Sequence, residues 1–171
     1  QSQSIKAICD ADWKDLTIIR LPEIPTFTLL VGWIGQVAIT DSLIQATEKK
    51  RKVETDSAFY KEFLTKSHAI VQGLQNAWNK QDIPALQEGI RANRVLLNEF
   101  AQVMQLEIET PALQTLCNLA EQNGACAKTS GAGGGDCGIC FTQNETQRQQ
   151  IETQWAKAQI QVLPLTIAEA W

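Results

Sequence analysis

The residues of this chain best suited to chemistry lie in one glycine-rich stretch, AKTSGAGGGDCGICF, residues 127–141. Five of its fifteen residues are glycine, and glycine at that density indicates backbone that turns with positive φ or lies close to another group. Successive amide N–H groups in such a turn can form an anion-binding concavity. A flexible surface loop is the alternative, but the core-like run CGICF follows directly, so we favour an anion or phosphate site.

The glycines match neither of two well-known phosphate-binding motifs. A P-loop requires Lys directly after its last glycine, and none is present there. Gly133, Gly135 and Gly138 satisfy the dinucleotide-binding spacing formally, but they precede a strand-like run rather than a helix. The helix N-terminus that would hold a pyrophosphate is therefore missing from this pattern.

Three side chains beside the glycines could take part in binding. Lys128 offers a mobile positive charge and Ser130 a hydroxyl donor, and both groups suit phosphate. A surface lysine and a turn-forming serine are the plain alternatives for these two. Asp136 could assist a metal or a substrate hydroxyl, or could bond its own backbone as turn aspartates do.

The other candidate residues favour structural roles. His68 is the only histidine, and the sequence offers it no partner for a catalytic triad or a metal site. Cys137 and Cys140 form a C-x-x-C pattern, but thiols three apart in a strand point to opposite faces. Glu107 and Glu109 lie between two predicted helices, and their spacing alone does not indicate a catalytic carboxylate pair.

Length and composition predict one domain over residues 1–171, with an ordinary hydrophobic content of 44%. The net charge of -4 gives no argument for nucleic acid or for an anionic membrane surface. The basic run at 49–52 is interpreted as a solvated face. Five scattered cysteines form no disulfide framework and favour free thiols in the cytoplasm, and no apolar run has the length of a membrane span.

The elements that must position the glycine stretch follow from periodicity and capping signals. Two β-rich runs, 13–21 and 26–33, predict an antiparallel pair. Thr40 or Asp41 could cap a helix to about residue 53, and an apolar stripe predicts a helix over 57–79. Asp82 caps the next helix, and a third runs from Thr110 to the stop signal at 123–124.

After the glycines, alternation predicts a strand at 137–142, and Asn144 caps a polar helix. A final strand is predicted over 160–168. The order is two strands, helices, the glycine loop and then β-α-β, which indicates an α+β fold: an antiparallel sheet with helices packed on one side.

Two stretches carry a resemblance to a known family. KTSGAGGGDCG, residues 128–138, resembles the third motif of the GHMP kinases, and LLVGWIGQVAITDSLI, residues 29–44, resembles a stretch of the same family. The version with Asp-Cys after the glycines is similar to the bacterial branch that acts on 5-phosphomevalonate. The resemblance covers essentially the whole chain and implies the C-terminal domain fold of that family, a ferredoxin-like core with extra helices.

The resemblance implies transfer of the γ-phosphoryl group of ATP, with Mg²⁺, to 5-phosphomevalonate, giving 5-diphosphomevalonate on the route to isoprenoids. Mevalonate or another GHMP acceptor is the alternative, and a non-catalytic phosphate-binding module is a further one. Lys128 would reach the substrate phosphate, and the stretch from Gly32 to Thr40 would approach the substrate from the other side. The residues implied to line the phosphate site are Ser130, Gly131, Ala132, Gly133, Gly134, Gly135 and Asp136.

The first and second motifs of the family, and its usual catalytic carboxylate, do not occur in these residues. They belong to the N-terminal half of GHMP kinases, so we expect the chain to work with an N-terminal domain of the same protein and to be inactive, or nearly so, alone. It could then expose an apolar face where that domain docks. No metal-ligating residue and no catalytic residue is assigned within the chain.

Overall fold

The computed structural model describes residues 21–24, 26–35, 58–131 and 133–165. Within them lies a four-stranded sheet in the order β2-β3-β1-β4, and every neighbouring pair is antiparallel. The strands are β1 (Thr28–Trp33), β2 (Cys126–Thr129), β3 (Cys137–Thr142) and β4 (Gln161–Leu163). The helices are α3 (Ala58–Asn79), α4 (Ile83–Met104), α5 (Pro111–Gln122) and α6 (Glu145–Lys157).

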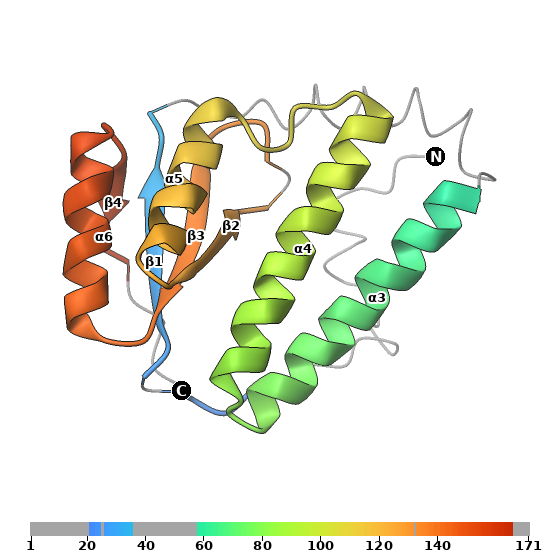
Figure 1. The fold of residues 1–171 in the computed structure, drawn as a ribbon, viewed down its shortest axis with the longest axis horizontal. Coiled ribbons are helices and arrows are strands. Elements are labelled where there is room, and N and C mark those ends of the chain that lie inside the picture. The colour runs from blue at the N-terminus through green and yellow to red at the C-terminus, as the bar shows by residue number, and fades with distance from the viewer. Residues whose placement is uncertain (1–20, 25, 36–57, 132, 166–171) are drawn as a thin grey trace, which may run out of the picture.

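Helices α5 and α6 lie together over one face of the sheet, and the pair α3–α4 stands beside the edge strand β2 (Figure 1). The sheet order, read from β4, is 4-1-3-2, and helices join β1 to β2 and β3 to β4. This is the ferredoxin-like β-α-β-β-α-β arrangement, and the predicted α+β class is confirmed. None of the described helices is both long and apolar enough to cross a membrane.

The packing of α5 on the sheet depends on glycine. Gly32 and Gly138 face each other in the register of β1 and β3. A Cβ atom at Gly138 would lie 2.5 Å from a methyl carbon of Leu116, and one at Gly32 would lie 2.8 Å from Leu116 and from Trp155. Both large side chains are fully buried, so the missing Cβ atoms are what lets α5 and α6 approach the strands.

Three of the predicted helix starts are confirmed by their caps. The carboxylate of Asp82 accepts the amide of Ala85 at 3.1 Å, and the amide oxygen of Asn144 accepts the amide of Gln147 at 2.9 Å. Thr110 caps α5 in the same way, with Pro111 at the first helical position. These short contacts satisfy N–H groups that have no partner within the helix.

The stretch from Gly124 to Cys137 differs from the sequence prediction. It holds the strand β2, which was not predicted and which pairs with β3 from Cys126↔Phe141 to Thr129↔Gly138. The glycine run is therefore the connection of a hairpin, not a link from a helix to a strand. The final strand is shorter than predicted and covers Gln161–Leu163. The expected strand at 13–21 lies outside the described residues except for Leu21, which is not in a strand. The expected helix at 41–53, the basic run at 49–52 and Thr40 also lie outside the described residues.

Candidate phosphate-binding loop

The loop between β2 and β3, residues 130–136, has mostly left-handed backbone. The φ angles are +64° at Gly131, +77° at Gly133, +81° at Gly134 and +112° at Gly135. Asp136 follows with φ of +95°, although L residues rarely adopt such an angle. The prediction of positive φ is confirmed at these glycines, and Ala132 lies outside the described residues.

The carbonyl oxygen of Ile108, in the linker between α4 and α5, lies directly against the glycine loop. A Cβ atom at Gly133 would be 2.3 Å from the carbonyl oxygen of Ile108 and 2.6 Å from its side chain. The amide of Gly134 donates to the same carbonyl oxygen at 2.8 Å. The linker between α4 and α5 therefore contacts the loop directly, and Gly133 is required there on steric grounds as well as by its φ angle.

Two further backbone hydrogen bonds fix the ends of the loop. The amide of Ser130 donates to the carbonyl of Cys137 at 2.9 Å, and the amide of Ile34 donates to the carbonyl of Asp136 at 3.0 Å. The second bond brings the start of the Gly32–Thr40 stretch beside the loop. Residues 36–40 of that stretch lie outside the described residues.

The predicted side chains lie around the loop at different depths. Ser130 and Asp136 are exposed. Lys128 is half-buried on β2, and its ammonium donates to the carbonyl of Thr129 at 2.8 Å. Burial lowers the pKa of Lys128, so an anion placed beside it would stabilise its charged form.

The amide donors of this loop divide into two groups. Those of Ser130 and Gly134 donate to protein carbonyls and hold the loop in shape. An anion bound here would be held by the other amides of the loop, the Ser130 hydroxyl and the Lys128 ammonium. Backbone N–H groups in a turn can form an anion-binding concavity, and this is how the loop would hold a phosphate group.

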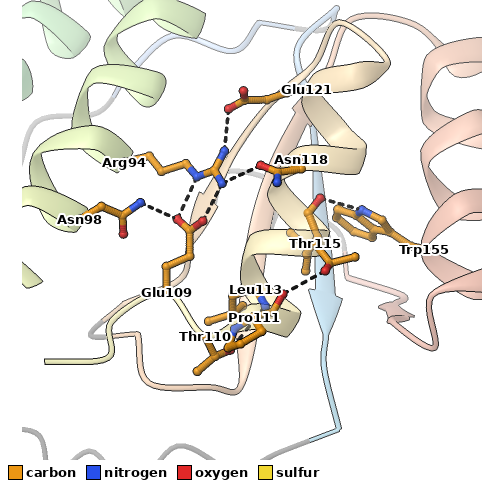
Figure 2. Close-up of polar contacts among 11 residues, drawn as sticks. Arg94, Asn98, Glu109, Thr110, Pro111, Leu113, Thr115, Asn118, Glu121 and Trp155 are labelled. Atoms are coloured by element: carbon orange, nitrogen blue, oxygen red, sulfur yellow. Dashed lines mark hydrogen bonds and ion pairs between the residues drawn. The ribbon is translucent and has the colours of Figure 1, made fainter. Parts of the chain in front are cut away.

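Sequence reasoning missed a polar cluster centred on Arg94 of α4, next to the linker that supports the loop (Figure 2). The guanidinium donates to both carboxylate oxygens of Glu109, with Nε to Oε2 at 2.8 Å, and Asn98 donates to the same carboxylate at 3.0 Å. Arg94 also donates to Asn118 and Glu121 of α5, each at 3.0 Å. The signal available in the sequence was the four-residue spacing of Arg94 and Asn98, which places both on one face of a helix.

The charges of this cluster stabilise each other. Burial alone would raise the pKa of Glu109, but hydrogen bonds from Arg94 and Asn98 and the positive charge of Arg94 lower it below its usual value. The pKa of Arg94 is raised, chiefly by its hydrogen bond to Glu109. The pair is therefore ionised at neutral pH.

An open cavity of about 470 Å³ lies at the end of α4 and along the linker. Asn98, Ile108 and Glu109 line part of it, together with Gln102 and Gln114. Its walls combine amide and carboxylate groups with the aliphatic side chain of Ile108. The cavity thus adjoins both the cluster and Ile108, whose carbonyl contacts the glycine loop.

The residues given structural roles from the sequence are dispersed. His68 is exposed on α3, and in the described part of the chain no three His, Cys, Asp or Glu residues converge to hold a metal ion. Cys137 is half-buried and Cys140 fully buried, in keeping with opposite faces of β3. Burial raises the pKa of Cys140 far above that of a free thiol, so this thiol is not reactive at neutral pH.

Comparison with known proteins identifies relatives that share this architecture. The family model for the C-terminal region of GHMP kinases matches residues 70–161. The chain is 36% identical over 160 residues to a phosphomevalonate kinase from Streptomyces sp. (strain CL190), covering 92% of this chain and 42% of that protein.

Two solved structures are similar in fold and in sequence. The Lin0012 protein of Listeria innocua matches with a TM-score of 0.84 and 33% identity, over 95% of this chain and 45% of that one. The Streptococcus pneumoniae phosphomevalonate kinase in complex with phosphomevalonate and AMPPNP matches with a TM-score of 0.69 and 29% identity, over 80% and 38% of the two chains. The chain thus spans less than half the length of these relatives.

Proposed function

This chain belongs to the GHMP kinase family, and we propose that it forms the C-terminal part of a kinase that transfers the γ-phosphoryl group of ATP to 5-phosphomevalonate. The observation that carries the proposal is the left-handed loop from Gly131 to Asp136, whose sequence resembles the third motif of the family. The identity to a phosphomevalonate kinase, 36% over 160 residues, supports this acceptor. The product would be 5-diphosphomevalonate.

In this proposal the loop holds phosphate groups where the two substrates meet. Ser130 and the amides of Gly131, Ala132, Gly133, Gly135 and Asp136 are the proposed contacts, and Gly134 maintains the loop through Ile108. Lys128 would exchange the carbonyl of Thr129 for a phosphate oxygen, and Thr40 would approach from the strand side. Phosphoryl transfer needs such groups because its catalysis rests on positioning and on neutralising charge.

Magnesium and the catalytic carboxylate are proposed to come from outside these residues. Within residues 21–24, 26–35, 58–131 and 133–165 no cluster of three ligating side chains is formed, so the Asp136 carboxylate is not a metal site by itself. We propose that an N-terminal domain of the same protein holds ATP and Mg²⁺, and that the 171-residue chain alone is inactive. The length of the relatives supports a second domain.

We also propose that the protein is cytoplasmic. The described cysteines are free thiols, which supports a place in the cytoplasm.

The test is an ADP-release assay with Mg²⁺-ATP on the intact protein and on the 171-residue chain. We expect the intact protein to turn over 5-phosphomevalonate but not mevalonate, and the shorter chain to be silent. Turnover of mevalonate alone would reject the acceptor, and turnover by the shorter chain would reject the need for a second domain. A protein that binds phosphomevalonate without releasing ADP would instead be a non-catalytic binding module.

Two substitutions locate the site within the intact protein. Ser130→Ala and Lys128→Met are expected to lower kcat/KM for 5-phosphomevalonate. Ser67→Ala is the matched control, because it makes the same chemical change in α3, a helix that packs on α4 and lies outside the glycine loop. Equal activity of the Ser130 and Ser67 variants would remove the hydroxyl from the proposed site.

A further inference from the structure

The linker between α4 and α5 carries the carbonyl on which the glycine loop rests. The oxygen of Ile108 accepts the Gly134 amide at 2.8 Å and leaves no space for a side chain at Gly133. Ile108 itself is 6% exposed and packs against Phe100 and Met104. Ile108 therefore supports the middle of the loop, at Gly133 and Gly134.

Glu109, the residue after Ile108, is held by hydrogen bonds from Arg94 and Asn98, and we call this group of three residues the clamp. The carboxylate of Glu109 accepts a two-pronged contact from Arg94 and a third hydrogen bond from Asn98. The Glu109 side chain is 5% exposed and that of Arg94 is 12% exposed. Contacts of the guanidinium–carboxylate fork are specific in direction as well as strong, so the clamp restrains the backbone of Glu109 and of the adjoining Ile108.

The clamp is anchored on two helices at once. Arg94 belongs to α4, and its remaining donors reach Asn118 and Glu121 of α5 (Figure 2). Both helices pack on β2, the strand that leads into the glycine loop. Arg94 thus ties the linker to the two elements that also support the start of the loop.

Net stability is not the distinctive contribution of such a pair. A buried ion pair is often no more stabilising than well-packed apolar side chains, because desolvation offsets the attraction. Its distinctive property here is that it fixes one carbonyl relative to two helices.

We propose that Arg94 and Glu109 are positioning residues, which act through Ile108 to hold the glycine loop in its phosphate-binding shape. Neither residue contacts a substrate in this account, and the functional part of the proposal rests on the kinase activity proposed above. Its structural part, the restraint of the loop, can be measured without activity.

The first measurement is amide hydrogen exchange by mass spectrometry on the intact protein. Glu109→Gln and Arg94→Met are expected to speed exchange in peptides covering 130–137 by about tenfold, since the Gly134 amide loses its fixed acceptor. Peptides covering 155–163, where the Ile160 amide donates to Trp155, should be unchanged. Glu152→Gln is the control, because it removes a half-buried Arg148–Glu152 pair on α6.

The second measurement compares kcat/KM with stability. Ile151→Val, on the buried face of α6, serves as a variant with lowered stability and an intact clamp. We expect Glu109→Gln and Arg94→Met to lose about tenfold or more in kcat/KM, a loss that Ile151→Val does not show. Arg94→Lys, which keeps the charge but not the fork, should recover part of it.

The outcomes separate the two proposals. Unchanged exchange in 130–137, or a rise shared equally by 155–163, would overturn the clamp. A selective rise with unchanged kcat/KM in an active enzyme would overturn the functional role of Arg94 and Glu109, because loosening the loop would then have no effect on catalysis. An inactive wild-type protein would count against the proposed function, while the exchange data would still decide whether the clamp holds the loop.

Discussion

Replacing Gly133 by Ala tests whether the linker and the glycine loop are in contact as described. The substitution adds a Cβ atom at a residue with φ of +77°, in a position 2.3 Å from the carbonyl oxygen of Ile108. Because that atom belongs to the backbone, it cannot move aside by a change of rotamer. The loop must lift from the linker, and the hydrogen bond from Gly134 to Ile108 is then lost.

The expected cost has two parts. Left-handed backbone costs a non-glycine residue about 1–2 kcal/mol, and the lost hydrogen bond adds about 0.5–1.5 kcal/mol. The free energy of unfolding should therefore fall by about 1.5–3.5 kcal/mol, which corresponds to roughly 3–14 °C in Tm for a chain of this size.

Gly131→Ala is the matched control. Gly131 has a similar φ angle of +64°, but a Cβ atom there would meet nothing within 4 Å. Only the conformational part applies, about 1–2 kcal/mol. Both variants would be unfolded in urea and followed by tryptophan fluorescence, in which the buried Trp155 reports the loss of the core. Equal midpoints for the two variants would refute the contact with Ile108.

Three further predictions concern Asp136, Glu109 and the described cysteines. Asp136→Gly should raise the free energy of unfolding by about 0.5–1 kcal/mol, since relief of the strained φ angle exceeds the entropic cost of glycine; a lower Tm would contradict this. The pKa of Glu109 is lowered in the folded protein, so its ionised carboxylate stabilises the fold above the unfolded pKa of about 4.3, and this stabilisation is lost as pH falls through the folded pKa. Urea midpoints of Glu109→Gln should therefore depend less on pH below about 5 than those of the wild type. Among the four described cysteines, the half-buried Cys137 should react first with N-ethylmaleimide at neutral pH, because the thiols at 117, 126 and 140 are buried and burial raises the pKa of Cys117 to about 12. Peptide mapping of the labelled protein checks the order of reaction, and earlier labelling of Cys117 would contradict the packing of α5.

The parts of the fold that depend on short-range contacts were predictable. The caps Asp82 and Asn144 each bond an amide three residues ahead, so neighbouring residues in the sequence determine them. The apolar stripe of α3 and the alternation of β3 are likewise local patterns. The helix boundaries therefore follow from the sequence to within a residue or two.

The strand β2 was missed because its conformation depends on distant partners. It has only four residues, CAKT, and begins two residues after Gly124. A run of four residues is too short for alternation to distinguish a strand from a loop. Pairing with β3 and packing against α4 and α5 hold it extended. The same holds for the Arg94 cluster, whose acidic partners lie 15 and 27 residues away. Only the packing of α4 and α5 on the same strand, β2, brings them together.

The glycines of this chain serve three physical needs that look alike in the sequence. Gly138 gives Leu116 room to pack, Gly133 gives room to the carbonyl of Ile108, and Gly131 has open space around it and needs only its φ angle. The first two needs are met by the protein itself, so the number of glycines overstates the case for a ligand. The case rests on Gly131, where no packing contact demands glycine, and on Asp136, a non-glycine residue held at φ of +95° beside it. Strained backbone of this kind persists where the surrounding structure maintains it, often at functional sites, so these two positions carry more of the argument for binding than the glycine run as a whole.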